Sequence, residues 1–293
     1  MLKFKKIELK DFDNYKKYFQ KTEELSCENA FVNLLVWQCT YNNMIAECDG
    51  QLFIKSGTEG KESFKLPVGG NLIDGIKKIE EYCGDKKIRF WAQQGKRLEE
   101  FLGTYKDEYI ITPHRDAFDY IYRQEDLANL SGKKYHSKRN HISAFSKKHD
   151  WCYKRITEDN IEEIKKLADL WYNQNSHRLN SSMECERNGV NTILSNFSFL
   201  QMKGGAIYIN DTPVAFTLGS EISPKIFDIH IEKALPEFGE AYTVINQQFV
   251  KNELADYEYI NREDDMGLEG LRKAKLSYKP EILLEKYSLE RKI

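Results

Sequence analysis

The sequence predicts an α+β protein of two similar halves, each a mixed and mostly antiparallel sheet flanked by helices. Three observations lead to this prediction. The chain has 293 residues, which suits two domains of ordinary size. In both halves, short apolar runs bounded by turn residues are interspersed with amphipathic helical patterns. The order of these patterns is approximately the same in residues 1–124 and 151–293, which a basic stretch at 125–150 separates.

Local patterns define the elements of the first half. Asp49-Gly50 lies between two apolar runs, and this dipeptide tolerates the positive φ angles of a hairpin turn. The apolar run at 29–38 is interpreted as core, without chemistry. The expected order is a strand at 2–9, helices at 12–25 and 29–41, a hairpin at 43–57, a helix at 71–84, a strand at 87–93, a helix at 95–103, and strands at 107–113 and 117–123.

The second half follows a basic helix expected at 134–149, where strand-forming residues are few. Asn210-Asp211 separates two apolar runs and predicts a second hairpin turn. The expected order is a strand at 151–156, helices at 160–174 and 189–201, strands at 204–210, 212–222 and 225–233, a loop and helix at 234–254, a strand at 257–261, a helix at 267–275, and one final strand at 281–289.

Composition restricts the classes of partner. Hydrophobic residues make up 41% of the chain and aromatic residues 13%, which is enough apolar material for real cores. Charged residues reach 31%, but the net charge is only -2. Because no global field attracts nucleic acid or an anionic membrane, any affinity for phosphate must come from a local patch.

The sequence contains no targeting or membrane signal. Residues 1–19 have no continuous apolar region, and no run approaches the roughly 20 apolar residues that span a bilayer. We therefore expect a cytoplasmic protein. The scattered cysteines form no CxxC pair, so free thiols and no metal site are expected. They are Cys27, Cys39, Cys48, Cys83, Cys152 and Cys185.

Four segments carry a resemblance to a known family. They are residues 29–38, 132–145, 235–246 and 261–280. The last is the most specific, because a helix is followed by Lys275, Tyr278 and Pro280. The order of elements is that of the GNAT acyltransferase fold, and two such units in tandem resemble the Fem-type aminoacyl-tRNA-dependent transferases. More closely, the chain resembles the family named after the C-terminal domain of bacterial phosphatidylglycerol lysyltransferases. This implies two tandem GNAT-like domains joined by the basic linker helix.

The GNAT resemblance also implies where a donor would bind. In that fold a glycine-containing loop opens a helix, and its backbone N–H groups bind the pyrophosphate of coenzyme A. The corresponding residues are Phe238, Gly239, Glu240 and Ala241. Pro236 stands where the family has Gln or Arg, and Glu240 adds a negative charge. This departure favours aminoacyl-tRNA over a coenzyme A thioester as donor, and no further cofactor is required. A plain strand-to-helix turn is the alternative.

Three polar residues occupy every second position in the middle of the strand predicted at 225–233. Asp228, His230 and Glu232 share one face of that strand. In GNAT enzymes the equivalent strand lies beside the acyl-transfer cleft, so the imidazole or a carboxylate could accept a proton from an attacking amine. A solvent-facing strand surface is the alternative.

The basic linker offers an anion-binding face. Lys138, Arg139 and Asn140 lie at the middle of the predicted helix. They could hold the phosphate of an anionic small molecule, a lipid head group or tRNA. A solvated linker helix is the alternative.

The helix predicted at 267–275 carries a lysine on its inward face. Leu268, Leu271 and Lys275 share that face, so the ammonium group must reach a partner or a polar cavity. Together with Arg272, it could stabilise the oxyanion of a tetrahedral intermediate. The acids interpreted as the N-terminal cap of this helix are Glu263, Asp264 and Asp265.

These residues suggest a function. We expect an acyl- or aminoacyltransferase that acts on an amine or hydroxyl, with Lys275 and the Asp228, His230 and Glu232 group as its catalytic residues. The alternative is a binding module without catalysis, which takes a phosphorylated ligand or an anionic lipid head group.

Overall fold

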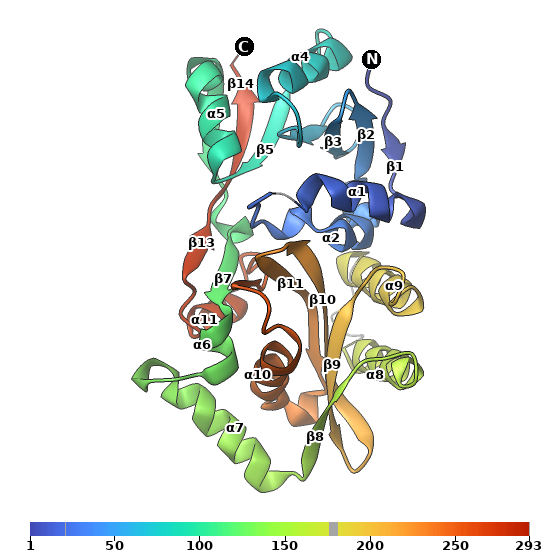
Figure 1. Ribbon diagram of the computed structural model, residues 1–293, viewed down its shortest axis with the longest axis vertical. Coiled ribbons are helices and arrows are strands. Elements are labelled where there is room, and N and C mark those ends of the chain that lie inside the picture. The colour runs from blue at the N-terminus through green and yellow to red at the C-terminus, as the bar shows by residue number, and fades with distance from the viewer. Residues whose placement is uncertain (21, 176–180, 293) are drawn as a thin grey trace.

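The computed structural model describes residues 1–20, 22–175 and 181–292. It contains two seven-stranded sheets placed one above the other along the long axis, and both chain termini lie at the upper end (Figure 1). Helices flank both sheets, which confirms the predicted α+β class. Within the described residues, no helix is long and apolar enough to cross a membrane.

The upper sheet has the strand order β1-β2-β3-β4-β5-β14-β6. Neighbouring strands are antiparallel except β4 and β5, which run parallel. Asp49 and Gly50 both have positive φ, so the β2–β3 hairpin forms as predicted. The strands are β1 (Lys5–Lys6), β2 (Met44–Cys48), β3 (Gln51–Ser56), β4 (Ser63–Lys65), β5 (Arg89–Gln93), β14 (Lys286–Arg291) and β6 (Tyr109–Pro113).

The lower sheet has the order β13-β7-β12-β11-β10-β9-β8. All neighbours are antiparallel except β11 and β12. Asn210 and Asp211 also have positive φ and connect β9 to β10 as predicted. The strands are β13 (Ile282–Leu284), β7 (Asp119–Arg123), β12 (Tyr259–Asn261), β11 (Ile226–Ala234), β10 (Thr212–Ser223), β9 (Lys203–Ile209) and β8 (Trp151–Arg155).

The two sheets exchange a strand. When the strands are counted from β1 in the upper sheet and from β8 in the lower sheet, both sheets have the same order of parallel and antiparallel pairings. The sixth strand of each sheet, however, comes from the opposite half of the chain: β14 in the upper sheet and β7 in the lower sheet. Strand β14 follows β13 in the chain yet pairs with β5 and β6, whereas β7 follows β6 yet pairs with β12 and β13. The ranges 1–124 and 151–293 therefore do not coincide with the two sheets. The single strand expected at 281–289 is also corrected, because it divides at Glu285 into one strand of each sheet.

Helices cover both sheets and fill the junction between them. In Figure 1, α4 and α5 lie over the upper sheet and α1 and α2 lie at the junction; α8 and α9 cover one face of the lower sheet and α10 the other. The helices are α1 (Phe12–Phe19), α2 (Phe31–Val36), α3 (Gln38–Tyr41), α4 (Leu72–Cys83), α5 (Lys96–Tyr105), α6 (Gln124–Asn129), α7 (His136–Lys148), α8 (Ile161–Gln174), α9 (Ser181–Ser195), α10 (Ala241–Glu253) and α11 (Glu269–Leu276).

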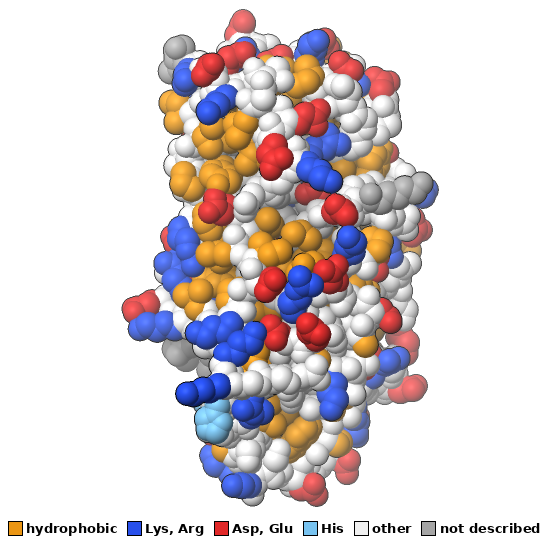
Figure 2. Space-filling model, turned by 60° about the vertical axis from the view of Figure 1, so that its left-hand side comes forward, with side chains coloured by type: hydrophobic (Ala, Val, Ile, Leu, Met, Phe, Trp, Pro, Cys, Tyr) orange, Lys and Arg blue, Asp and Glu red, His pale blue; other side chains and the backbone are white. Residues whose placement is uncertain are grey.

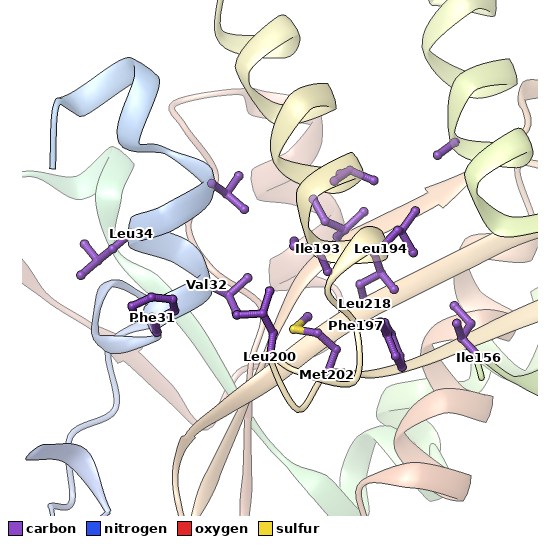
Figure 3. Packing of buried hydrophobic residues seen from close by; sticks show 14 of the residues in the cluster. Phe31, Val32, Leu34, Ile156, Ile193, Leu194, Phe197, Leu200, Met202 and Leu218 are labelled. Atoms are coloured by element: carbon purple, nitrogen blue, oxygen red, sulfur yellow. The ribbon is translucent and has the colours of Figure 1, made fainter. Parts of the chain in front are cut away.

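One hydrophobic core crosses the junction. Phe31, Val32 and Leu34 of α2 belong to the same buried cluster as side chains of α8, α9 and β10 (Figure 3). The approach of α2 to α9 is close, since a Cβ atom on Gly189 would lie 2.5 Å from Val36 Cγ1. Burial of apolar surface therefore holds the two halves together as one unit.

Two expectations about single residues were wrong. Cys39 and Cys185 form a disulfide between α3 and α9, with Cα atoms 6.1 Å apart, although free thiols were expected. A separation of 146 residues gives no local signal of such a pairing. Leu268 is 55% exposed rather than on an inward face, because α11 begins only at Glu269.

A buried ion pair connects the first residues of the two exchanged strands, β7 and β14. Asp119 begins β7 and Lys286 begins β14, and their carboxylate and ammonium groups are 2.7 Å apart. Both side chains are almost fully buried. Asp119 also accepts hydrogen bonds from the Cys27 backbone and from the Asn261 amide. The pair thus connects the upper sheet, the lower sheet and the segment before α2.

We predict strong coupling between these two side chains. Asp119→Asn removes the nearer of the two carboxylates that neutralise the buried Lys286 ammonium group and leaves Glu28 at 3.2 Å, so the free energy of unfolding should fall by about 3 kcal/mol. The double variant Asp119→Asn/Lys286→Met should lose less than the sum of the two single losses. Denaturant unfolding followed by circular dichroism measures both quantities. The exposed Asp256→Asn serves as control, with a change within about 0.5 kcal/mol. Additive losses would contradict the coupling.

Candidate functional site

A cavity of about 380 Å³ opens at the junction of the two halves. Its apolar wall includes Trp37, Tyr41 and Trp91, and its polar wall carries carboxylates, amides and one lysine. The lining residues are Cys27, Glu28, Asn33, Leu34, Trp37, Tyr41, Asn43, Ser56, Ser63, Lys65, Trp91, Ala117, Ser182, Glu263, Asp264 and Met266. Asn33 and Trp37 belong to the run at 29–38, so the interpretation of that run as core alone is wrong.

Three parts of the chain form this cavity. The segment from Cys27 to Asn43 enters from the first half, and strands β3, β4 and β5 supply the wall behind it. The loop from Glu263 to Met266, which follows β12, closes the opposite side. The cavity therefore requires both halves, as expected for a cleft at the junction of two GNAT-like units.

Glu28 is held on the wall by cations. Its carboxylate lies 3.4 Å from Lys65 Nζ and 3.2 Å from Lys286 Nζ, and it accepts a hydrogen bond from the Trp91 indole. Burial alone would raise the pKa of Glu28, but attraction to Lys286 and Lys65 outweighs burial and lowers it to about 2. Glu28 is therefore a fixed negative charge at neutral pH.

Glu263 and Asp264 form an acidic edge of the cavity. Glu263 accepts a hydrogen bond from Asn33 and contacts His230 Nδ1 at 3.1 Å. Burial raises the pKa of Asp264 to about 6, with the neighbouring charge of Glu263 adding to the rise. The interpretation of these acids as the N-terminal cap of α11 was wrong, because the residue at the cap position is Leu268 and no side chain caps the helix. Only Asp265 is enclosed by cations, pairing with Arg115 and with Arg272.

Of the three polar residues of β11, Asp228 is buried and the side chains of His230 and Glu232 are largely covered, so the alternative of a solvent-facing surface is wrong. Asp228 is completely buried, and the side chain of His230 is 4% exposed. His230 Nε2 lies 2.8 Å from Ser220 Oγ, and Nδ1 lies between Asp228 and Glu263. Glu232 points to Arg262, at 2.9 Å. His230 therefore reaches the cavity only through Glu263.

Lys275 is buried on α11, as its position in the helix predicted. Its ammonium group donates hydrogen bonds to the backbone carbonyls of Arg262 and Asp264, and it does not line the cavity. Burial lowers the pKa of Lys275, although Glu263 and Asp264 oppose this. Lys275 thus holds the loop that carries the acidic edge.

The other predicted basic residues lie away from the cavity. Arg272 pairs with Asp265 and Asp116. Arg139 of α7 donates to the carbonyls of Leu130 and Gly132, which holds the helix against the turn that precedes it. Lysine and arginine side chains gather around a histidine in the lower half of the face in Figure 2.

Lys138 and Asn140 complete the residues predicted on α7. Lys138 Nζ lies 3.8 Å from the ring centre of Tyr278, and burial with the nearby Arg262 lowers its pKa to about 8. Asn140 is exposed and contacts His136 at 3.2 Å. Lys138 is thus a charged residue of α7 whose environment differs clearly from that of a solvated side chain.

The predicted donor-binding residues form the start of α10. Phe238 packs against His149, and Gly239, Glu240 and Ala241 follow in the turn that leads into the helix. Glu240 pairs with Lys148 at 3.0 Å. None of these four residues lines the junction cavity.

Sequence reasoning missed several residues of the site. Glu28, Lys65, Asp119 and Lys286 carry charge into the junction but stand alone in the sequence, far from any motif. A charged residue at an inward position of a strand was an available signal for Lys65 and Lys286. It could not identify their partners.

Comparisons with known proteins agree with this architecture. A crystal structure of a conserved protein of unknown function from Bacteroides thetaiotaomicron is 35% identical, covers 100% of both chains and has a TM-score of 0.93. L-PGS from Bacillus licheniformis is 12% identical, with 95% of this chain and 91% of that chain covered and a TM-score of 0.66. FemX is 8% identical, with 98% and 96% covered and a TM-score of 0.56.

These likenesses confirm the predicted fold of two tandem GNAT-like units, which the chain shares with L-PGS and FemX. The family model described as "Phosphatidylglycerol lysyltransferase, C-terminal" matches residues 19–290, which is nearly the whole chain. The protein therefore belongs to the family of the phosphatidylglycerol lysyltransferase C-terminal domain.

Proposed function

We propose that this protein transfers an acyl or aminoacyl group to an amine or hydroxyl acceptor, and that the transfer takes place in the junction cavity. The family description, which names a lysyltransferase, supports this class of reaction. The observation that carries the proposal is the cavity itself, which places carboxylates and a lysine against an aromatic wall. Such a site can hold two reactants together and exclude water.

Acyl transfer requires a group that accepts the proton of the nucleophile and a positive group near the developing oxyanion. Asp264 lines the cavity, and its recorded side-chain hydrogen bond is from the Met266 backbone. We assign the proton acceptor to Asp264, at a place where an acceptor amine or hydroxyl can approach. Lys65 supplies an ammonium group in the lining of the same cavity.

The residues expected from the sequence take supporting roles in this proposal. His230 orients Glu263, and Lys275 holds the loop through the carbonyls of Arg262 and Asp264. Glu232 and Arg272 keep the same loop in place through their ion pairs with Arg262 and Asp265. Asp228 lies behind Glu263 and does not line the cavity. These are positioning residues rather than catalytic ones.

The donor in this proposal is aminoacyl-tRNA or an acyl-coenzyme A thioester. The ion pair of Glu240 with Lys148 brings a carboxylate to the turn where a pyrophosphate would bind, which favours aminoacyl-tRNA. Purified protein should be incubated with charged tRNA or labelled thioesters in the presence of amine and hydroxyl acceptors. Product formation from either donor is expected. Saturable binding of a phosphorylated ligand or lipid head group without turnover would replace the proposal by the binding module.

Asp264→Asn should lower kcat by at least about a hundredfold, because the proton acceptor is removed while the shape of the side chain is kept. KM should change little. The matched control is Asp256→Asn, an exposed aspartate outside the cavity. Steady-state kinetics with the active donor measures both constants. A kcat near that of the wild type would exclude Asp264 as the proton acceptor.

Lys275→Met should reduce both stability and turnover. Two backbone carbonyls lose their donor, so we expect about 1–3 kcal/mol less free energy of unfolding and at least a tenfold lower kcat as the loop shifts. Lys273→Met, an exposed change on the same helix, should leave both quantities close to wild type. Denaturant unfolding and kinetics on both variants provide the comparison. Unchanged stability of Lys275→Met would contradict the positioning role.

Lys138 should lose its proton, and so become reactive, at a lower pH than an ordinary lysine. With a pKa of about 8, its reaction with an amine-directed reagent should reach half of its plateau near pH 8, well below the pH for a lysine-containing model peptide. Peptide mapping by mass spectrometry at several pH values gives this profile. If Lys138 holds an anionic part of the substrate, inorganic phosphate should shift the midpoint upward. A midpoint near pH 10 without phosphate would contradict the buried environment.

A further inference from the structure

A group of metal-ligand side chains lies immediately behind the wall of the junction cavity. Cys27 offers its thiol sulfur, and Asp228 and Glu263 each offer a carboxylate oxygen, with all three atoms within 4.8 Å of one another. They come from the segment before α2, from β11 and from the loop after β12. Three separate parts of the fold therefore converge on one point.

Asp228 has an unusual environment. Its side chain is completely buried, and neither carboxylate oxygen has a hydrogen-bond partner among the described residues. His230 Nδ1 is 3.3 Å from Oδ2 without forming an aligned hydrogen bond. A buried carboxylate without hydrogen bonds costs several kcal/mol unless it gains a proton or a cation.

The charges around Asp228 leave a negative excess. Lys286 is 2.7 Å from Asp119, and Lys65 is 3.4 Å from Glu28, so these ammonium groups have their own partners. Lys275 gives its hydrogen bonds to carbonyls. The carboxylates that gather at this junction are the buried Asp119 and Asp228 and the half-buried Glu28, Glu263 and Asp264, against the ammonium groups of Lys65, Lys275 and Lys286.

His230 lies outside the group of three converging ligand atoms, but its Nδ1 contacts two of the three side chains, so an entering ion would have to draw it inward as the fourth donor. Its Nδ1 is 3.1 Å from Glu263 Oε1 and 3.3 Å from Asp228 Oδ2. The other ring nitrogen lies 2.8 Å from Ser220 Oγ, the kind of outer contact that orients a ligating histidine.

We propose that Cys27, Asp228, Glu263 and His230 bind a divalent cation of the zinc type. One thiolate, one imidazole and two carboxylates are a donor set that suits this ion. Cys27 and Glu263 also line the cavity, which gives the ion a path of entry. The ion would join the segment before α2 to the lower sheet.

Binding requires the loss of protons. The Cys27 thiol donates to Asp119 at 3.2 Å, so thiolate formation releases this proton to solvent as the ion enters. Burial and the neighbouring Asp119 carboxylate raise the pKa of the Cys27 thiol, and the Lys286 ammonium group, 3.5 Å from the sulfur, opposes this rise only in part, so the charge of the entering ion must stabilise the thiolate. On binding, the His230 proton moves from Nδ1, where it faces Glu263, to Nε2, where it faces Ser220, and Nδ1 is then free for the ion.

The test uses the full chain after treatment with a chelator. Cobalt(II) is added first, because a thiolate ligand gives a charge-transfer absorption in the near ultraviolet, and zinc should then displace cobalt at about one ion per chain. Thermal unfolding should shift upward with either ion. Cys27→Ser should abolish the absorption, whereas the exposed Cys152→Ser should retain it. Ser220→Ala should weaken binding about tenfold.

The variant Asp228→Asn distinguishes between two explanations, a bound ion and a carboxyl group that only carries a proton. If Asp228 only carries a proton, the amide replaces it at equal shape, and the response to cobalt or zinc stays as in the wild type. If Asp228 is a ligand, the upward shift is lost while the metal-free protein remains folded. The proposal is overturned if the wild type shows no shift, or if wild type and Cys27→Ser shift equally. None of these readouts uses turnover, so they are independent of the proposed transferase activity.

Discussion

The ion pair between Asp119 and Lys286 stands at the point on which the architecture depends. Each of these residues begins a strand that leaves its own half of the chain and completes the sheet of the other. Burial of one charge without the other would be costly, so the two crossings are energetically linked. The shared core around α2 and α9 then holds the halves at a fixed distance. The cavity lies at the junction where β7 and β14 cross from one half of the protein into the sheet of the other.

The chemistry of the junction follows from this arrangement. The loop after β12 faces the segment before α2 because β12 lies beside the exchanged strand β7. Acids from the loop and from the segment therefore meet, and lysines from β4 and β14 partly neutralise them. A site assembled this way has its charged groups set by backbone elements from both halves. Its geometry is then as rigid as the two sheets, which suits reactions that depend on preorganised charge.

Local chemistry made some features predictable. Asp49-Gly50 and Asn210-Asp211 indicated hairpins because the turn requires positive φ at both positions, and the shared strand face of Asp228, His230 and Glu232 followed from the period of two. Non-local features were not predictable. A run of apolar residues does not say which sheet it joins, so the division of 281–289 between two sheets was missed. The pairing of Cys39 with Cys185 and the burial of His230 likewise depend on tertiary contacts.

The strand exchange also has a consequence for how the chain reaches its final form. The upper sheet lacks the strand between β5 and β6 until residues 286–291 arrive, so two strands from early in the chain wait with unpaired backbone groups. Pairings of such large sequence separation form slowly, because the entropy of closing the intervening chain is lost first. During synthesis, the first half therefore exposes open sheet edges for as long as the rest of the protein is being made. This chain should depend on protection from aggregation more than a protein whose two halves fold in succession.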